Sequence, residues 1–156
     1  MQDAMHRRFR DRGFTLVEAL VALVVLSIGL LGVAALQFTS LKANHGSATR
    51  TQAVYLAYDI IDRMRTNPTS ANGGEYQLGF DDTPSGTTIA KKDLISWRQN
   101  ITNALPGGSV APTGSVNVDA ASHVITVSIK WDDSHAEQST SAANVVTFTV
   151  VTQISN

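Results

Sequence analysis

The residues with the clearest chemical potential lie near the amino terminus, where one acidic side chain interrupts a long apolar segment. Glu18 is the only charged residue between Phe14 and Leu36, and apart from Thr15 and Ser27 the rest of that segment is apolar or small. An acidic side chain costs up to about 2.5–3.5 kcal/mol at the middle of a bilayer and less near its edge. Glu18 therefore needs a positive partner or a hydrogen-bonding role.

The apolar segment from Phe14 to Leu36 is long enough to cross a membrane. As a helix, its 23 residues would extend about 34 Å, which matches the ~30 Å hydrocarbon core of a bilayer. A basic cluster precedes it, made of Arg7, Arg8, Arg10 and Arg12. No further basic residue appears before Lys42, so the positive-inside rule predicts a cytoplasmic start and an exported remainder.

Besides a simple membrane anchor, this segment has two ordinary interpretations: a helix capping box and a secretory signal peptide. Thr15 and Glu18 fit the S/T-x-x-E pattern of a capping box, in which the glutamate accepts a hydrogen bond from a backbone N–H at the helix start. A capping box does not explain the positions of Gly13 and Phe14. Val33-Ala34-Ala35 resembles the cleavage site of a secretory signal peptide, although the apolar segment exceeds the usual ~7–15 residues.

The amino-terminal string as a whole suggests a third interpretation. A basic leader ends in Gly13, Phe14 follows, and Glu18 is the fifth residue counted from Phe14. This arrangement resembles the prepilin signature of type IV pilins and type II secretion pseudopilins. The resemblance implies that residues 1–13 form a leader peptide, which prepilin peptidase removes by cutting between Gly13 and Phe14. It also implies N-methylation of Phe14 and a role for Glu18 in assembly.

The expected role of Glu18 follows from the charge that cleavage creates. A new α-amino group at Phe14 would be largely cationic near neutral pH. Unpaired charges are costly in a low-dielectric layer, and opposite charges attract strongly there. We therefore expect the amine of an incoming subunit to pair with Glu18 of a subunit already in the filament, which would set the register of helix stacking.

Three further stretches resemble minor pilins of the PilV type from Gram-negative bacteria. They are VALVVLSIGLLGVAALQ, AYDIIDRMRTNP and DLISWRQNITNALPGG, which together make up about a third of the chain. The resemblance implies a structural subunit that helps to start pilus assembly, sits at or near the pilus tip and, in some systems, affects cell adhesion or twitching motility. The alternatives are a type II secretion pseudopilin and a membrane-anchored periplasmic binding module.

The resemblance also implies partners and a location. The partners would be other minor pilins, the major pilin, the inner-membrane assembly platform and prepilin peptidase. Before assembly the chain would be a single-pass protein of the bacterial inner membrane with its head in the periplasm. After assembly it would be part of the pilus at the cell surface.

A long helix must position these residues. The stretch from Gln37 to Arg65 contains no proline, so we expect a helix from Phe14 to about Arg65 that ends at Asn67-Pro68. Residues 14–36 would be its transmembrane and filament-core half, and residues 37–66 its amphipathic half. The residues at helical spacing that we expect to pack against a sheet are Val54, Ala57, Tyr58, Ile61 and Met64. Gly29 and Gly32 allow a neighbouring helix to approach closely, but each glycine also weakens the helix. The sequence does not decide whether the helix unwinds near these glycines during assembly.

Residues 67–156 should form a globular, β-rich head. Residues 69–90 are rich in turn formers and predict an irregular loop with a short strand near Tyr76 to Phe80. A second helix is expected near 91–105, closed by Pro106-Gly107-Gly108. Its apolar face consists of Leu94, Trp97, Ile101 and Leu105. Trp97 could be a ligand platform, but a helical apolar stripe favours a role in the core.

Alternating apolar and polar residues predict three strands in the rest of the head. The pattern begins at Val116, recurs between His123 and Trp131, and recurs again from Val145 to Val151. Such runs, separated by polar turns, indicate an antiparallel sheet with one buried face. The predicted fold class is therefore α+β, the type IV pilin fold, with the long amino-terminal helix packed on a carboxy-terminal antiparallel sheet.

The sequence offers little support for catalysis or cofactor binding. There is no cysteine, the net charge is −1, and the four histidines lack ligand spacing, so thiolate chemistry and a general attraction to nucleic acid are disfavoured. Asp132-Asp133 with His135 and Glu137 could bind a cation, but solvated charges in a turn between strands are favoured there and at Asp81-Asp82. We therefore expect no catalytic, cofactor-binding or metal-binding residues.

Overall fold

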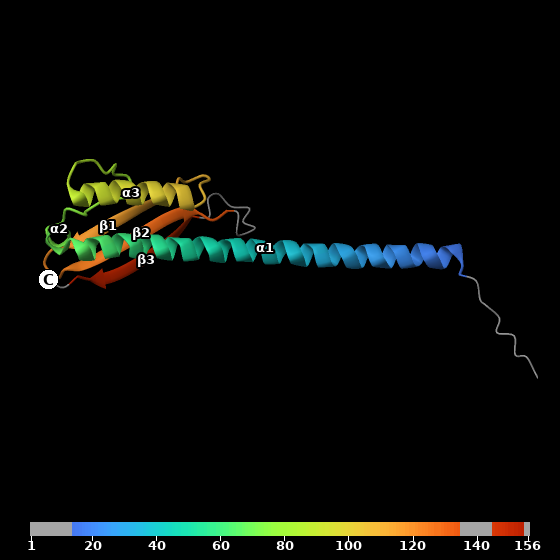
Figure 1. Ribbon diagram of the computed structural model, residues 1–156. Coiled ribbons are helices and arrows are strands. Elements are labelled where there is room, and N and C mark those ends of the chain that lie inside the picture. The colour runs from blue at the N-terminus through green and yellow to red at the C-terminus, as the bar shows by residue number, and fades with distance from the viewer. Residues whose placement is uncertain (1–13, 135–144, 155–156) are drawn as a thin grey trace, which may run out of the picture. The chain divides into compact units, whose positions relative to one another are not determined.

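The computed structural model describes residues 14–134 and 145–154. The elements in chain order are α1 (Leu16–Thr66), α2 (Pro68–Asn72), α3 (Ile89–Ala104), β1 (Thr113–Asp119), β2 (Val124–Asp132) and β3 (Val145–Gln153) (Figure 1). The chain divides into two compact units, Met1–Ser40 and Leu41–Asn156. The predicted α+β fold, with a long apolar helix followed by an antiparallel sheet, is confirmed.

Helix α1 has 51 residues, and local signals explain both of its ends. Its first turn carries Glu18 and its last turn carries Arg63 and Arg65, which places each sign of charge where the helix dipole favours it. The N–H of Asn67 bonds to the carbonyl of Met64 at 3.1 Å, and Pro68 cannot continue the helix. The helix thus ends at the predicted place and begins two residues after Phe14.

The carboxy-terminal part of α1 has a well-defined buried face. Its fully or almost fully buried side chains are Ala53, Leu56, Ala57, Ile60, Ile61 and Met64. Two members of the predicted stripe were wrong, since Tyr58 is 48% exposed and Val54 is only partly buried. The buried face is rotated toward Leu56 and Ile60, and about half of Tyr58 remains in solvent, which suits a ring that carries a polar hydroxyl.

The segment after α1 differs from the predicted irregular loop with a short strand. Pro68 begins the short helix α2, because its fixed φ suits the first helical position. The expected strand near Tyr76 to Phe80 is reduced to a single bridge between Leu78 and Val116. Two backbone hydrogen bonds of 2.9 and 2.8 Å form this bridge. The head therefore holds this segment mainly through side chains.

Helix α3 supplies a second buried face to the head. Thr88 caps it by accepting a hydrogen bond of 3.3 Å from the N–H of Lys91, which explains why the helix begins two residues before the predicted position. The predicted apolar face is confirmed, since Leu94, Trp97, Ile101 and Leu105 are all buried. Trp97 is fully buried, so it anchors the core and does not form a ligand platform.

The three strands form an antiparallel sheet in the order β1-β2-β3. On the central strand, every second side chain is fully buried: Ile125, Val127, Ile129 and Trp131. On β3, the alternate residues Val146, Phe148 and Val150 pack against the same core while remaining partly exposed. The predicted sheet with one buried face is confirmed, and buried residues of α1, α2, α3, β1 and β2 share one core.

Candidate processing and assembly site

The first turn of α1 is organised around Thr15 and Glu18. Thr15 stands before the first helical residue, and its Oγ1 accepts a hydrogen bond of 3.3 Å from the Glu18 N–H. The Thr15 carbonyl accepts the next bond, 3.2 Å from the Ala19 N–H. Thr15 is therefore the N-cap, and it satisfies one of the backbone donors that a helix start leaves unpaired.

Only half of the expected capping box is present. The second half would be a bond from the Thr15 N–H to the Glu18 carboxylate, and no such bond exists among the described residues. The Glu18 side chain is exposed and, within the part of the chain that the structure describes, makes no hydrogen bond or ion pair. The carboxylate is therefore available to a group from outside the chain.

The surface around Glu18 is apolar. Phe14, Leu16 and Val17 are 76, 78 and 67% exposed, and the apolar side chains of the following turns up to Leu36 are similarly exposed. By length and composition α1 is apolar enough to cross a membrane. An apolar surface of this extent requires lipid or other protein to cover it.

The structure covers only part of the predicted processing site. Phe14 is described, and it lies ahead of the first helical turn with an exposed side chain. Gly13 and the rest of the predicted leader, residues 1–13, lie outside the described residues. The assignment of these residues therefore continues to depend on their sequence.

The head contains a polar network that the sequence pattern did not predict. Arg63 of α1 contacts the carboxylates of Asp59 at 3.2 Å and Asp93 at 3.3 Å. The hydroxyl of the fully buried Tyr76 donates to Asp93 at 2.7 Å and accepts from the Asn67 amide at 3.5 Å. Burial and then the Asp93 hydrogen bond raise the pKa of Tyr76 to about 12. The network joins α1, α3 and the segment after α2.

Only one contact of this network could have been found from the sequence. Asp59 and Arg63 are four residues apart on a helix, a spacing that brings opposite charges together. The contacts of Asp93 with Arg63 and Tyr76 depend on the tertiary fold, since 30 and 17 positions separate these residues. The network holds these three parts of the head in place.

The predicted solvation of Asp132 and Asp133 was wrong. Their exposures are 2% and 5%, and the Asp132 carboxylate accepts bonds from the Ser109 N–H at 2.7 Å, the Ser109 hydroxyl at 2.6 Å and the Ser134 N–H at 2.9 Å. These bonds, led by that of the Ser109 side chain, hold the pKa of Asp132 well below its usual range. Asp132 thus fastens the loop before β1 to the end of β2.

The other residues considered as cation ligands do not form a centre. His135 and Glu137 lie outside the described residues. The described residues contain no group of three or more His, Cys, Asp or Glu side chains that could hold a metal ion. Asp81 and Asp82 are exposed, as predicted, and Asp82 accepts a bond of 2.6 Å from the Gly79 N–H within its own loop.

Comparison with known protein families finds two similarities in the first part of the chain. Residues 35–92 match the family model described as Type IV pilin Tt1218, a family of structural subunits. Residues 8–34 match the model of the prokaryotic N-terminal methylation motif, which includes Gly13, Phe14 and Glu18. No curated protein and no solved structure shows a significant match to the chain. Residues 8–92 are therefore similar to a prepilin N-methylation motif followed by part of a type IV pilin domain.

Proposed function

We propose that this protein is a minor type IV pilin of the PilV type that helps to initiate pilus assembly at or near the pilus tip. Prepilin peptidase cuts it between Gly13 and Phe14, and Phe14 is then N-methylated. Before assembly, residues 14–36 anchor it in the inner membrane with the head in the periplasm. Its partners are other minor pilins, the major pilin and the inner-membrane assembly platform.

The observation that carries the proposal is the state of Glu18. Thr15 satisfies the backbone N–H of Glu18, so the carboxylate is not needed to cap its own helix. It stands exposed in the first turn, surrounded by exposed apolar side chains. When neighbouring helices cover that surface, an unpaired carboxylate would become costly, and a cationic amine from a second subunit would offset this cost.

A cationic partner of the right kind is available in each processed subunit. The α-amino group that cleavage exposes on Phe14 is largely protonated near neutral pH. It lies at the start of the same apolar segment, so neighbouring helices with a small axial stagger bring one amine to the next carboxylate. Glu18 thus acts as a positioning residue for assembly.

Two alternative functions share parts of this proposal. A type II secretion pseudopilin would use the same cleavage and the same Glu18 pairing but would assemble with secretion components. A membrane-anchored binding module would use α1 only as a tether. The PilV-like stretches 57–68 and 93–108 favour the pilus role, because they lie outside the leader and the apolar half of α1, which pseudopilins share.

The first experiment determines the mature amino terminus by mass spectrometry of the protein from membranes and pili. We expect a chain that begins at methylated Phe14. A Gly13→Leu variant should retain its leader, because the peptidase must approach a backbone that glycine leaves unobstructed. Gly32→Leu is a matched control that should be cleaved normally, since a Cβ at Gly32 would meet no described atom within 4 Å apart from its chain neighbours and the nearby backbone of its own helix.

The second experiment separates the pilus role from its alternatives. Deletion of the gene should reduce the number of surface pili and leave type II secretion unchanged, and the protein should co-purify with other pilins. In the first experiment, a mature protein that still begins at Met1, or one that begins at Leu36, would contradict cleavage between Gly13 and Phe14. Normal piliation with impaired secretion would favour the pseudopilin, and normal piliation and secretion would favour the binding module.

A further inference from the structure

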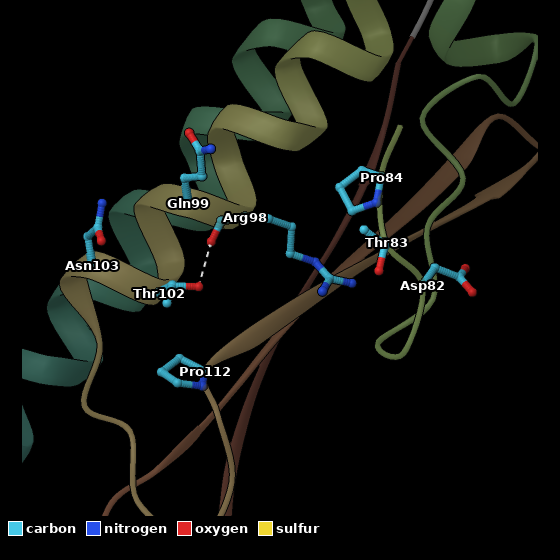
Figure 2. A pocket seen from close by; sticks show the side chains of 8 residues that line it. All are labelled: Asp82, Thr83, Pro84, Arg98, Gln99, Thr102, Asn103 and Pro112. Carbon is cyan, nitrogen blue, oxygen red and sulfur yellow. Dashed lines mark hydrogen bonds between the residues drawn. The ribbon is translucent and has the colours of Figure 1, made fainter. Parts of the chain in front are cut away.

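The head contains an open groove that the assembly role does not use. It lies between α3, the loop at residues 82–84 and the residue that precedes β1 (Figure 2). Its volume is about 510 Å³, within the ~300–1,000 Å³ typical of small-molecule sites. All of its lining residues belong to the unit Leu41–Asn156, and none belongs to the site around Glu18.

Arg98 is the central polar group of this groove. Its side chain extends from α3 toward the loop that carries Thr83 (Figure 2). One nitrogen, Nη2, donates to the carbonyls of Gly79 at 2.6 Å and Phe80 at 3.2 Å. The Nε–H is buried and has no hydrogen-bond partner among the described residues. A buried donor without a partner is costly, but this nitrogen has no surface in the groove, so Arg98 contributes to the lining through the rest of its guanidinium group and through its charge.

The charges of the groove select against a charged occupant. Arg98 supplies one positive group and Asp82 one negative group to the same lining. Asp82 is exposed and uses one oxygen for the Gly79 N–H, so its carboxylate can still accept from a ligand hydroxyl. An anion would be repelled by Asp82 and a cation by Arg98. The balance favours a neutral ligand that both donates and accepts hydrogen bonds.

The remaining lining combines uncharged polar groups with small apolar surfaces. Gln99, Thr102 and Asn103 are exposed along one side of α3. Thr102 donates to the Arg98 carbonyl at 3.0 Å, so its oxygen remains an acceptor. Pro84 and Pro112 add apolar ring surfaces, the latter buried. A sugar ring presents the complementary chemistry, with hydroxyls on its edge and C–H groups on its faces.

We propose that this groove binds a neutral sugar residue at the end of a glycan. A peptide would find fewer favourable contacts in this groove than a sugar would. Strand addition requires a free sheet edge, whereas the bridge between Leu78 and Val116 occupies the edge of β1 at Val116. Polyproline ligands require grooves lined by aromatic side chains, and none of the described residues that line this groove is aromatic. The proposal is independent of how the protein is processed or assembled.

Saturation-transfer NMR on the full-length processed protein tests the proposal. Phosphatidylcholine nanodiscs replace detergents, because many detergents carry sugar head groups. The probes are glucose, galactose, mannose, N-acetylglucosamine and their methyl glycosides. Glucuronic acid and glucosamine are matched anionic and cationic probes, and the tripeptide Gly-Asn-Gly tests for peptide binding. The site variant is Gln99→Ala with Asn103→Ala, and Asn100→Ala is the control, because Asn100 is exposed on α3 but does not line this groove.

We expect at least one neutral sugar and its methyl glycoside to bind with a Kd of about 1 mM or tighter. The double variant should weaken binding at least about tenfold, the effect of losing a hydrogen bond or two, while Asn100→Ala leaves it unchanged. Binding of no neutral sugar, stronger binding of either charged sugar or of the tripeptide, or equal binding by the double variant would overturn the proposal. Binding of free sugars without their glycosides would overturn its assignment to a glycan.

Discussion

The indole N–H of Trp97 donates a buried hydrogen bond of 2.8 Å to the backbone carbonyl of Leu56. The bond joins the middle of α3 to the carboxy-terminal part of α1, and both side chains lie in the common core. A helical carbonyl has a second lone pair for such a donor. The contact therefore fixes the position of α3 along α1 without breaking the backbone hydrogen bonds of α1.

The two tryptophans of the chain should respond differently to the same substitution. Trp97 and Trp131 are both fully buried, but the N–H of Trp131 has no hydrogen-bond partner among the described residues. Trp97→Phe loses volume and a hydrogen bond, whereas Trp131→Phe loses volume and an unpaired donor. We expect Trp97→Phe to lower the free energy of unfolding of the head by at least about 1 kcal/mol more than Trp131→Phe. Hydrogen exchange of the β2 amides measures the free energy of unfolding of each variant. Equal losses of stability in the two variants would show that the hydrogen bond from Trp97 to Leu56 contributes nothing.

Gly114 should not tolerate a side chain, because it lies under Trp97. A Cβ at this position would overlap the Cη2 atom of the Trp97 ring and lie 2.7 Å from Ile101 Cδ1. Gly114→Ala should therefore destabilise the head by about 1–3 kcal/mol. The loss should be smaller in a Trp97→Phe background, since the shorter ring makes room for the methyl group. Additive effects of the two substitutions in the same exchange measurement would contradict this packing.

Gly107→Ala is the matched control for this prediction. A Cβ at Gly107 would make only an ordinary contact of 3.4 Å with Pro112 Cδ. We expect its effect to stay within about 0.5 kcal/mol. A loss as large as that of Gly114→Ala would mean that any glycine substitution in this part of the head is harmful, and that the Trp97 contact is not the cause.

The sequence was sufficient for the parts of the fold that depend on periodicity. The faces of α3 and β2 were predicted correctly because each pattern is local and repeats several times. The buried face of α1 was predicted only in part, because a tyrosine is stable both in a core and at a surface, and Tyr58 lies half exposed beside the buried face. The sequence could not show the burial of Asp132, because its partner Ser109 is 23 positions away.

The candidate binding and processing sites also differ in whether the sequence can predict them. The spacing of Gly13, Phe14 and Glu18 is local, so the sequence alone is enough to predict a processing and assembly site there. The groove around Arg98 depends on three segments that only the tertiary fold brings together. No single one of those segments has a pattern that would indicate binding.

Tyr76 should make the stability of the head depend on alkaline pH. Its pKa in the folded protein is about 12, above the ordinary value near 10 for an exposed tyrosine. The folded state keeps this proton while the unfolded state loses it, so the stabilisation is complete below about pH 10 and is lost as the pH rises toward 12. The loss should reach roughly 2 kcal/mol. Tyr76→Phe should lack this component, and parallel pH profiles of the two proteins would contradict it.

Asp132 should have the opposite dependence at acid pH. Its pKa in the folded protein is lowered, chiefly by the Ser109 side chain. Its contribution to stability is therefore present above the ordinary aspartate value near 3.9 and lost as the pH falls toward its folded pKa. The difference in unfolding free energy between the parent and Asp132→Asn should shrink below about pH 4. Asp81→Asn, at an exposed position, is the control for the effect of the substitution itself.

The last prediction separates the two possible roles of Glu18. Glu18→Gln keeps the shape of the side chain and leaves the backbone N–H that Thr15 caps, so the helix should form as before. Membrane insertion should survive, since an apolar segment with one fewer charge inserts at least as well. Cleavage should survive because it depends chiefly on Gly13. The substitution removes only the charge that would balance the amine of a neighbouring subunit.

We therefore expect a Glu18→Gln strain to contain processed protein but to lose co-purification with other pilins and to carry fewer surface pili. Thr15→Val is the matched control, because it removes the cap and retains the carboxylate. It should cost the helix start about 1 kcal/mol and leave partner recovery largely intact. If Thr15→Val impairs assembly and Glu18→Gln does not, the first turn serves as a helix cap alone and the charge-pairing role of Glu18 is wrong.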